Sequence, residues 1–151
     1  ICTGATVNMG RPVLKPSEIP VDSALDRMVN YPLETKFGTL NITTVSMGNP
    51  HCIIFVESTE FADFERLGAY MEKHPIFPRY TNVEFVQVID RKTVRTGASA
   101  TLVACVLNNK TDREAAIKLK GGDLKISWLS DDGDVYMTGP ATTVFEGEID
   151  V

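Results

Sequence analysis

Cysteine and histidine are scarce in this 151-residue sequence, and the scarcity argues against two kinds of site. The three cysteines, Cys2, Cys52 and Cys105, are odd in number and show no C-x-x-C spacing, so they indicate neither a disulfide framework nor a zinc site. Only His51 and His74 could supply imidazole ligands, and we therefore expect no metal centre. Scattered, reduced thiols are typical of a cytoplasmic protein.

Long apolar runs and excess positive charge are also lacking. No stretch approaches the roughly 20 apolar residues that a membrane-spanning helix needs, and residues 1–5 show no features of a signal peptide. The net charge of −5 argues against nucleic acid or an anionic membrane as partner. With 43% hydrophobic and 23% charged residues, the composition predicts one globular domain with its own core.

Alternating polar and apolar residues predict that most of the chain is strand. His51–Val56 is apolar enough for a central strand, whereas the proline-rich segment Arg11–Asp22 should be an extended connection. A hairpin is indicated around Gly121-Gly122-Asp123. The remaining expected strands are 6–9, Thr39–Val45, Asn82–Ile89, Ile117–Lys120, Leu124–Leu129, Val135–Met137 and Thr143–Ile149.

Two helices of different character are expected. One begins near Glu60, is capped by Ser58 or Thr59, and has one apolar stripe made by Phe61, Phe64, Leu67 and Met71. The other, Gly97–Leu107, contains no charged side chain and is too short to span a membrane, so it should be buried on all sides. These elements predict an α+β fold in which a mostly antiparallel, strand-rich barrel surrounds a central buried helix.

The start of this buried helix is a candidate anion site. Thr96 and Gly97 are small enough for a ligand to approach the free backbone N–H groups, where the helix dipole favours a carboxylate or phosphate. The alternative is an ordinary threonine cap followed by a glycine for close packing.

Three further polar residues are candidates for binding or catalysis. Asn49 and His51 lie in and just after a tight turn between two buried strands, and Asn82 precedes another strand. The alternatives are that Asn49 and Asn82 only favour their turns and that His51 is a core histidine with satisfied hydrogen bonds. Cys52 and Cys105 lie among apolar residues, where a thiol is expected to be inert.

An ordered set of motifs resembles diaminopimelate epimerase over nearly the whole chain. Any one of them is weak, but their order and spacing match the family. The motifs are Val7–Pro12 (VNMGRP), Val45–Cys52 (VSMGNPHC), Thr81–Val86 (TNVEFV), Met137–Ala141 (MTGPA) and Phe145–Glu148 (FEGE).

This resemblance implies a specific reaction and specific residue roles. The family inverts one α-carbon of LL-diaminopimelate without pyridoxal phosphate or metal, using one cysteine from each of two similar domains as acid and base. It implies that Asn49 and Asn82 bind substrate, that Thr96 and Gly97 receive its carboxylate, and that His51 adjusts the proton affinity of the cysteine pair. It assigns no role to Glu84 or Gln87.

The sequence departs from the family between Arg95 and Thr96. The family has a Glu-Arg-Gly motif and an Ala-Cys-Gly-Thr-Gly loop before the central helix, whereas here strand and helix are expected to adjoin with residues missing. Residues 1–5 resemble the end of the first domain, and residues 6–151 the second domain. We expect a break in the chain at Arg95–Thr96 and another between Ala5 and Thr6.

The resemblance therefore predicts the substrate-binding half of a cytoplasmic epimerase that lacks both catalytic cysteines. The expected partner is diaminopimelate, with no nucleic acid, membrane, metal or cofactor, and a homodimer is a further expectation. Two alternatives are a different racemase or isomerase on the same fold and a non-catalytic binding domain.

Overall fold

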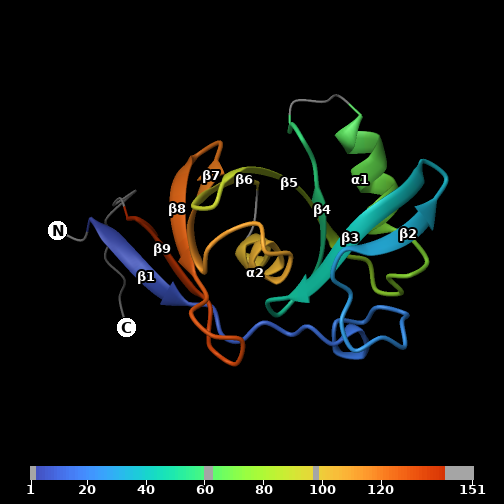
Figure 1. Cartoon of the computed structure of the whole chain (residues 1–151), viewed down its shortest axis with the longest axis horizontal. Coiled ribbons are helices and arrows are strands. Elements are labelled where there is room, and N and C mark those ends of the chain that lie inside the picture. Colours follow the sequence, from blue (N-terminus) through green and yellow to red (C-terminus); the bar gives the residue numbers. More distant parts are fainter. Residues whose placement is uncertain (1–2, 60–62, 97–98, 142–151) are drawn as a thin grey trace, which may run out of the picture.

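The computed structural model describes residues 3–59, 63–96 and 99–141, and in these a single curved sheet dominates (Figure 1). Nine strands are joined in the order β1-β9-β8-β7-β6-β5-β4-β3-β2. They are β1 (Gly4–Asn8), β2 (Tyr31–Thr35), β3 (Gly38–Ser46), β4 (Pro50–Phe55), β5 (Asn82–Asp90), β6 (Thr93–Arg95), β7 (Glu114–Leu119), β8 (Gly122–Ser127) and β9 (Tyr136–Pro140). The helices are the short 3-10 helix η1 (Pro16–Glu18) and the α-helices α1 (Phe64–Glu72) and α2 (Ala100–Leu107).

Most neighbouring strands are antiparallel, as the sequence predicted. Two pairs, β4 with β5 and β6 with β7, are parallel. Because parallel strands need a crossover connection, each of these pairs is linked through a helix, α1 in the first case and α2 in the second. The chain therefore contains two β-α-β units. The other consecutive strands of the sheet from β2 to β9 pair as antiparallel neighbours, and β1 pairs with β9 from the far end of the described chain.

The two α-helices differ in burial, and α2 is the helix that the sheet encloses (Figure 1). Residues Ala100 to Cys105 of α2 are all buried, whereas only Met71 is buried in α1. The core around α2 takes side chains from several strands, including Val45, Ile53, Val86, Val94, Ile117 and Ile126, together with Trp128. The prediction of a central buried helix is confirmed.

A second core lies on the other face of β3 and β4. Ile53 packs in the core around α2, while its neighbours Cys52 and Ile54 pack in a separate cluster with Met71 of α1. Successive side chains of a strand point to opposite faces, so β4 is buried on both sides. This explains why its sequence is continuously apolar.

Several predicted boundaries were wrong. Helix α1 begins at Phe64, with Asp63 as its N-cap residue, instead of following Ser58 or Thr59. The predicted helical residue Phe61 lies outside the described residues, as do Gly97 and the predicted strand Thr143–Ile149. Helix α2 begins at Ala100, so residues 96–99 connect it to β6 and the two elements do not adjoin as predicted.

One strand was not predicted, and one segment is more structured than expected. Strand β2 contains Pro32 and forms one edge of the sheet, where a residue without an N–H is tolerated. Strand β6, the strand that was expected to end near Arg95, has only three residues. The proline-rich connection contains η1 and makes a β-bridge to β3 between Val13 and Ser46.

Strand β1 crosses the boundary that the sequence suggested after residue 5. It pairs with β9 on both sides of that position, Ala5 with Gly139 and Thr6 with Thr138. The hydroxyl groups of Thr6 and Thr138 are 2.9 Å apart, which reinforces this register. No interruption of the strand is present there.

Candidate active site

The turn between β3 and β4 places two of the predicted site residues. Gly48 has a φ of +100°, a conformation that glycine adopts without strain, and its N–H donates to Ser46 Oγ at 3.2 Å. Asn49 and His51 follow, and Asn49 Oδ1 lies 3.1 Å from His51 Nε2. Since this amide oxygen can only accept, Nε2 carries the proton and donates it.

The parallel pairing of β4 and β5 adds the third predicted residue. His51 is the register partner of Asn82. The Nδ2 group of Asn82 donates to the carbonyl oxygen of Pro50 at 3.0 Å, so the side chain also ties β5 to the turn. The structure thus brings Asn49, His51 and Asn82 together, although they lie in separate motifs of the sequence.

Glu84 joins this group, and the sequence reasoning missed it. His51 is 8% exposed, and its Nδ1 atom lies 3.6 Å from Glu84 Oε1. The alternation of β5 contained the signal, because Glu84 is two residues beyond Asn82 and therefore on the same face of the strand. Val86, again two residues along, packs in the core around α2, so this face points to the interior of the curved sheet.

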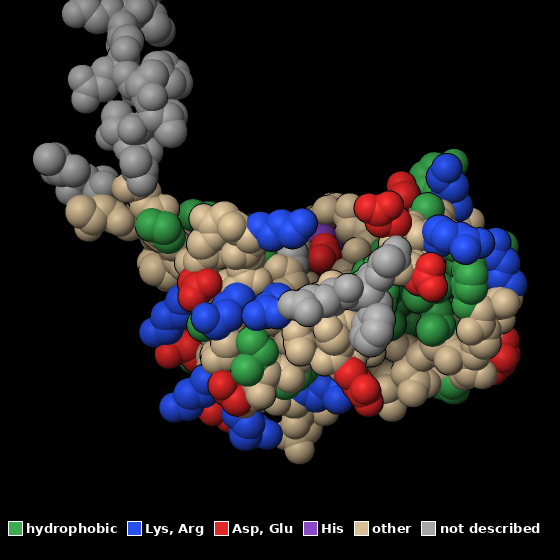
Figure 2. All heavy atoms as spheres, turned by 90° about the horizontal axis from the view of Figure 1, so that it is seen from above, with side chains coloured by type: hydrophobic (Ala, Val, Ile, Leu, Met, Phe, Trp, Pro, Cys, Tyr) green, Lys and Arg blue, Asp and Glu red, His purple; other side chains and the backbone are tan. Residues whose placement is uncertain are grey.

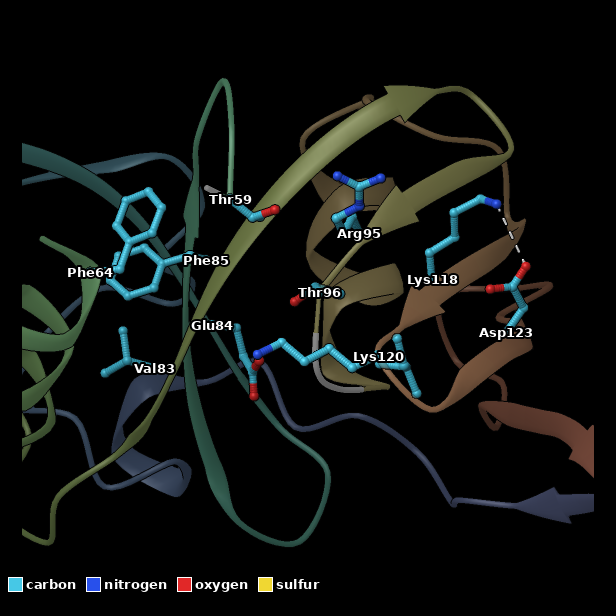
Figure 3. Close-up of a pocket in the computed structure, with 11 residues that line it drawn as sticks. Thr59, Phe64, Val83, Glu84, Phe85, Arg95, Thr96, Lys118, Lys120 and Asp123 are labelled. Carbon is cyan, nitrogen blue, oxygen red and sulfur yellow. Dashed lines mark ion pairs between the residues drawn. The ribbon is translucent and has the colours of Figure 1, made fainter. Parts of the chain in front are cut away.

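An open pocket of about 580 Å³ lies beside Glu84 of this group (Figure 3). Glu84 and Thr96 both line it, and Arg95 projects into it from β6. Thr96 Oγ1 lies 3.4 Å from Thr101 Oγ1 in the first turn of α2. Thr96, which was predicted to bind substrate, therefore lines the same pocket as Glu84, the residue that faces His51.

The backbone of Thr96 differs from what the sequence suggested. Its N–H donates to the carbonyl oxygen of Lys118 at 3.3 Å and continues the pairing of β6 with β7, so this group is already occupied. Only the hydroxyl group of Thr96 remains for a ligand. The chain continues in register past Arg95, and the expected break is not seen.

Neither described cysteine has the properties of a catalytic base. Burial raises the pKa of the Cys52 thiol far above its ordinary value of 9.0. Burial also raises the pKa of Cys105 to about 12, with a smaller opposing effect from Lys110. Both thiols are buried and protonated near neutral pH, as the sequence predicted, and a thiol in this state is a poor proton acceptor.

Acidic, cysteine and histidine side chains in the described ranges form no group of three or more that could hold a metal ion. Within the same ranges, no helix has the length and apolar character needed to cross a bilayer. The surface has a hollow in which a histidine lies beside an acidic side chain, with Lys and Arg side chains near it (Figure 2).

Comparison with known proteins relates this site to one enzyme family. Residues 43–96, which include Asn49, His51 and Asn82, match the family model for diaminopimelate epimerase. The chain is 45% identical to the diaminopimelate epimerase of Acetivibrio thermocellus, covering 96% of this chain and 57% of that protein. It is 46% identical to the corresponding protein of Methanococcus maripaludis, covering 96% and 58%.

The lengths of these matches show that the relatives are longer than this chain, both overall and within the matched stretch. The chain spans less than two thirds of the length of these relatives. Each match also extends over 160 positions, more than the 151 residues of this chain, so the relatives have additional residues within the matched stretch. A sequence that lacks an internal segment of the family is expected to give such a match.

Two solved structures share the fold at low sequence identity. A hydroxyproline epimerase from Agrobacterium vitis has a TM-score of 0.57 at 14% identity and covers 92% of this chain and 50% of its own. A probable proline racemase from Agrobacterium radiobacter K84 has a TM-score of 0.59 at 12% identity, covering 99% and 54%. These likenesses establish the architecture, which is the predicted strand-rich one.

Proposed function

The chain is homologous to diaminopimelate epimerases over 96% of its length, and on this premise we propose that it forms the substrate-binding second half of such an enzyme. The complete enzyme would convert LL-diaminopimelate to the meso isomer by acid–base chemistry between two cysteines, as a step of lysine biosynthesis in the cytoplasm. The observation that carries the proposal is the convergence of Asn49, His51 and Asn82 next to Glu84, which lines the pocket. A homodimer is part of the same proposal.

In this proposal each residue has a distinct task. Asn49 and Asn82 present amide groups to the amino-acid end of the substrate that is not inverted. His51, fixed between Asn49 and Glu84, lies where it can influence the proton affinity of neighbouring cysteines. Thr96, with Gly97 beyond it, receives the carboxylate near the start of α2.

The two acid–base cysteines are not supplied by the described part of this chain. Cys52 and Cys105 are buried, and their pKa values are raised. One reactive cysteine would come from the first domain, of which residues 1–5 would be the end, and one from a loop inserted before Thr96. Residues 6–151 would then bind and orient the substrate without catalysing the reaction alone.

Reconstruction of the missing parts tests the proposal. The loop between β6 and α2 of the Acetivibrio thermocellus relative is inserted between Arg95 and Thr96, and the first half of that relative is fused before residue 6. We expect this chimera to exchange the α-proton of LL-diaminopimelate in D₂O and to form the meso isomer. A matched chimera whose loop cysteine is replaced by serine should be inactive.

The residue roles are tested in the same chimera. Asn82→Ala should raise KM about tenfold or more, because a buried polar group of the substrate loses its partner at a cost of about 1–3 kcal/mol. His51→Ala should lower kcat and change the pH–rate profile more than it changes KM. A folded cysteine-containing chimera without proton exchange would refute the proposed function, and an unchanged pH–rate profile in His51→Ala would leave His51 as a core histidine.

A non-catalytic binding domain is a second candidate, favoured by the raised pKa values of Cys52 and Cys105. Such a domain would bind diaminopimelate while the chimera remained inactive. Calorimetric titration of this chain with diaminopimelate, together with the activity of the chimera, separates the two functions. A different racemase or isomerase would instead show proton exchange on proline in place of diaminopimelate.

A further inference from the structure

The sheet has a gap beside β5 where β6 ends early. Residues 82–86 of β5 pair with β4, but within the described ranges the pairing of β5 with β6 starts only at Gln87, the partner of Arg95. Strand β7 continues beyond the end of β6 to Leu119. Because neighbouring strands lie about 4.8 Å apart, the interval between β5 and the end of β7 leaves room for one strand. This interval, which we call the slot, lies within the pocket of about 580 Å³ (Figure 3).

The β5 side of the slot presents backbone groups without partners. The N–H of Val56 donates to the carbonyl oxygen of Val86, so the backbone of Val86 faces β4. Successive residues of a strand direct their N–H and C=O groups to opposite sides, so those of Val83 and Phe85 face the slot. Among residues 3–59, 63–96 and 99–141, no hydrogen bond reaches these groups. An unpaired strand edge of this kind is a template for a further strand.

The side of the slot formed by β6 and β7 is positively charged. Arg95 and Lys118 project from these strands, and Lys120 extends toward Glu84 (Figure 3). Neither Arg95 nor Lys120 has an ion-pair partner in the described part of the chain. Lys118 faces Asp123, but the atoms are 3.7 Å apart, longer than a charge-assisted hydrogen bond, and both side chains are about half exposed.

An extended peptide with acidic side chains satisfies both sides of the slot at once. Its backbone can pair with Val83 and Phe85, and its carboxylates can pair with Arg95 and Lys118. A small dicarboxylate has the charge but no backbone to pair, and a basic peptide has the backbone but the wrong charge. The edge strand β1 carries no charged residue, so that edge of the sheet lacks the electrostatic half of this combination.

We propose that the slot binds an extended, acidic peptide segment of a partner protein as an added strand, antiparallel to β5 and continuing the direction of β6. Residues 82–86 are available for pairing, so the bound segment should be about five residues long. These backbone and cationic contacts are separate from the substrate contacts proposed above and do not require epimerase activity. Since Arg95 and Lys118 are exposed, binding should weaken as salt increases.

Titration of the unmodified chain with matched peptides tests the proposal. The probe is Ac-Thr-Glu-Val-Glu-Thr-NH₂. Its controls are Ac-Thr-Lys-Val-Lys-Thr-NH₂ with reversed charge, Ac-Thr-Glu-Pro-Glu-Thr-NH₂ without the central N–H, and glutarate without a backbone. Calorimetry should show that the probe binds about tenfold more tightly than each control, and raising NaCl from about 0.05 to 0.5 M should weaken its binding severalfold.

Hydrogen exchange locates the added strand. The amide protons of Val83 and Phe85 should exchange about tenfold more slowly when the probe is bound, because each gains an acceptor. The amide proton of Val7 in β1, at the other end of the sheet, is the internal control and should be unaffected. Binding without slower exchange at Val83 and Phe85 would indicate charge pairing alone and would overturn the proposal.

Variants test the cationic side of the slot. Arg95→Gln and Lys118→Gln should each weaken binding of the probe about three- to tenfold, since each removes a charge-assisted contact. Arg79→Gln is the matched control, because Arg79 is exposed, has no ion-pair partner among the described residues and does not line the pocket. It should bind the probe as the unmodified chain does.

Further results would also overturn the proposal. They are binding of glutarate or the reversed-charge peptide as tight as that of the probe, unchanged binding in both slot variants, and an equal loss in Arg79→Gln. Slow exchange at Val83 and Phe85 before any peptide is added would count against it too, because the slot would then be filled by the chain itself or by a second copy.

Discussion

The Nδ1 atom of His51 faces a carboxylate oxygen of Glu84 at 3.6 Å, while Nε2 donates to Asn49 on the other side of the ring. The imidazole is therefore positioned between two residues from different strand motifs. Nδ1 has no hydrogen-bond partner within the described part of the chain. The charged group that faces it is the carboxylate of Glu84.

Replacing Glu84 with alanine should change the orientation of this ring more than the stability of the fold. Because 3.6 Å exceeds hydrogen-bond length, we expect the free energy of unfolding to fall by only about 0.5 kcal/mol. Long-range ¹H–¹⁵N NMR spectra of His51 should shift or broaden in Glu84→Ala but not in Glu57→Ala, an exposed control. A stability loss above about 2 kcal/mol would show that Glu84 is mainly structural.

Asn82→Ala should destabilise the chain even without substrate. The carbonyl oxygen of Pro50 loses the donor that now lies 3.0 Å away, and a typical hydrogen bond contributes about 1 kcal/mol. Urea unfolding followed by the fluorescence of Trp128, the single tryptophan, measures this change. Asn41→Ala, at an exposed site on β3, is the control and should unfold at the same urea concentration as the parent chain.

Gly48→Ala should disturb the turn that presents Asn49. An added Cβ meets no atom within 4 Å, so the cost arises only from the φ of +100°, at about 1 kcal/mol or more. Gly121→Ala also meets no neighbour but has no positive φ, and it should be nearly neutral. The difference in unfolding free energy between the two variants isolates the backbone strain; equal values would contradict this interpretation.

Stability should fall in alkaline solution because of the buried thiols. The pKa of Cys105 is raised from 9.0 to about 12 and that of Cys52 is raised further, so above pH 9 only the unfolded state readily releases these protons. Each thiol then lowers the unfolding free energy by about 1.4 kcal/mol per pH unit between pH 9 and the folded-state pKa. Below pH 9 neither contributes a slope.

Urea unfolding at several pH values from 8 to 11 measures this effect, with a Cys2→Ser background to remove the third thiol. The further variant Cys52→Ala/Cys105→Ala should have a shallower alkaline slope, whatever its stability at pH 8. Equal slopes in the two proteins would show that the thiols are not protected by burial.

The sequence predicted those elements whose residues follow a simple period. The apolar run His51–Val56 and the uncharged segment ending at Leu107 became β4 and α2, because both elements are buried on both sides and carry no Asp, Glu, Lys or Arg. The hairpin around Gly122 was equally clear, since Leu119 pairs with Gly122 across a two-residue loop. The alternation of residues did not reveal strand β6, because three residues are too few to show a period, and a strand ending near Arg95 was expected only from the family resemblance.

The site was predicted only in part, because its geometry depends on strand pairing. Asn49, His51 and Asn82 were found through motifs, but the sequence did not show that β4 and β5 are parallel and place His51 beside Asn82. Without that pairing, Glu84 was only a polar residue of a strand.

The pairing of β1 with β9 also constrains the order of folding. Thr6 and Thr138 are 132 residues apart in the chain, so β1 can pair with β9 only after nearly the whole sheet has been synthesised. All five residues of β1 are exposed, and no buried side chain holds the strand in place. During synthesis β1 cannot pair with β9 until residues 136–140 have been made, and in the finished protein its amide protons should exchange with solvent before those of β4.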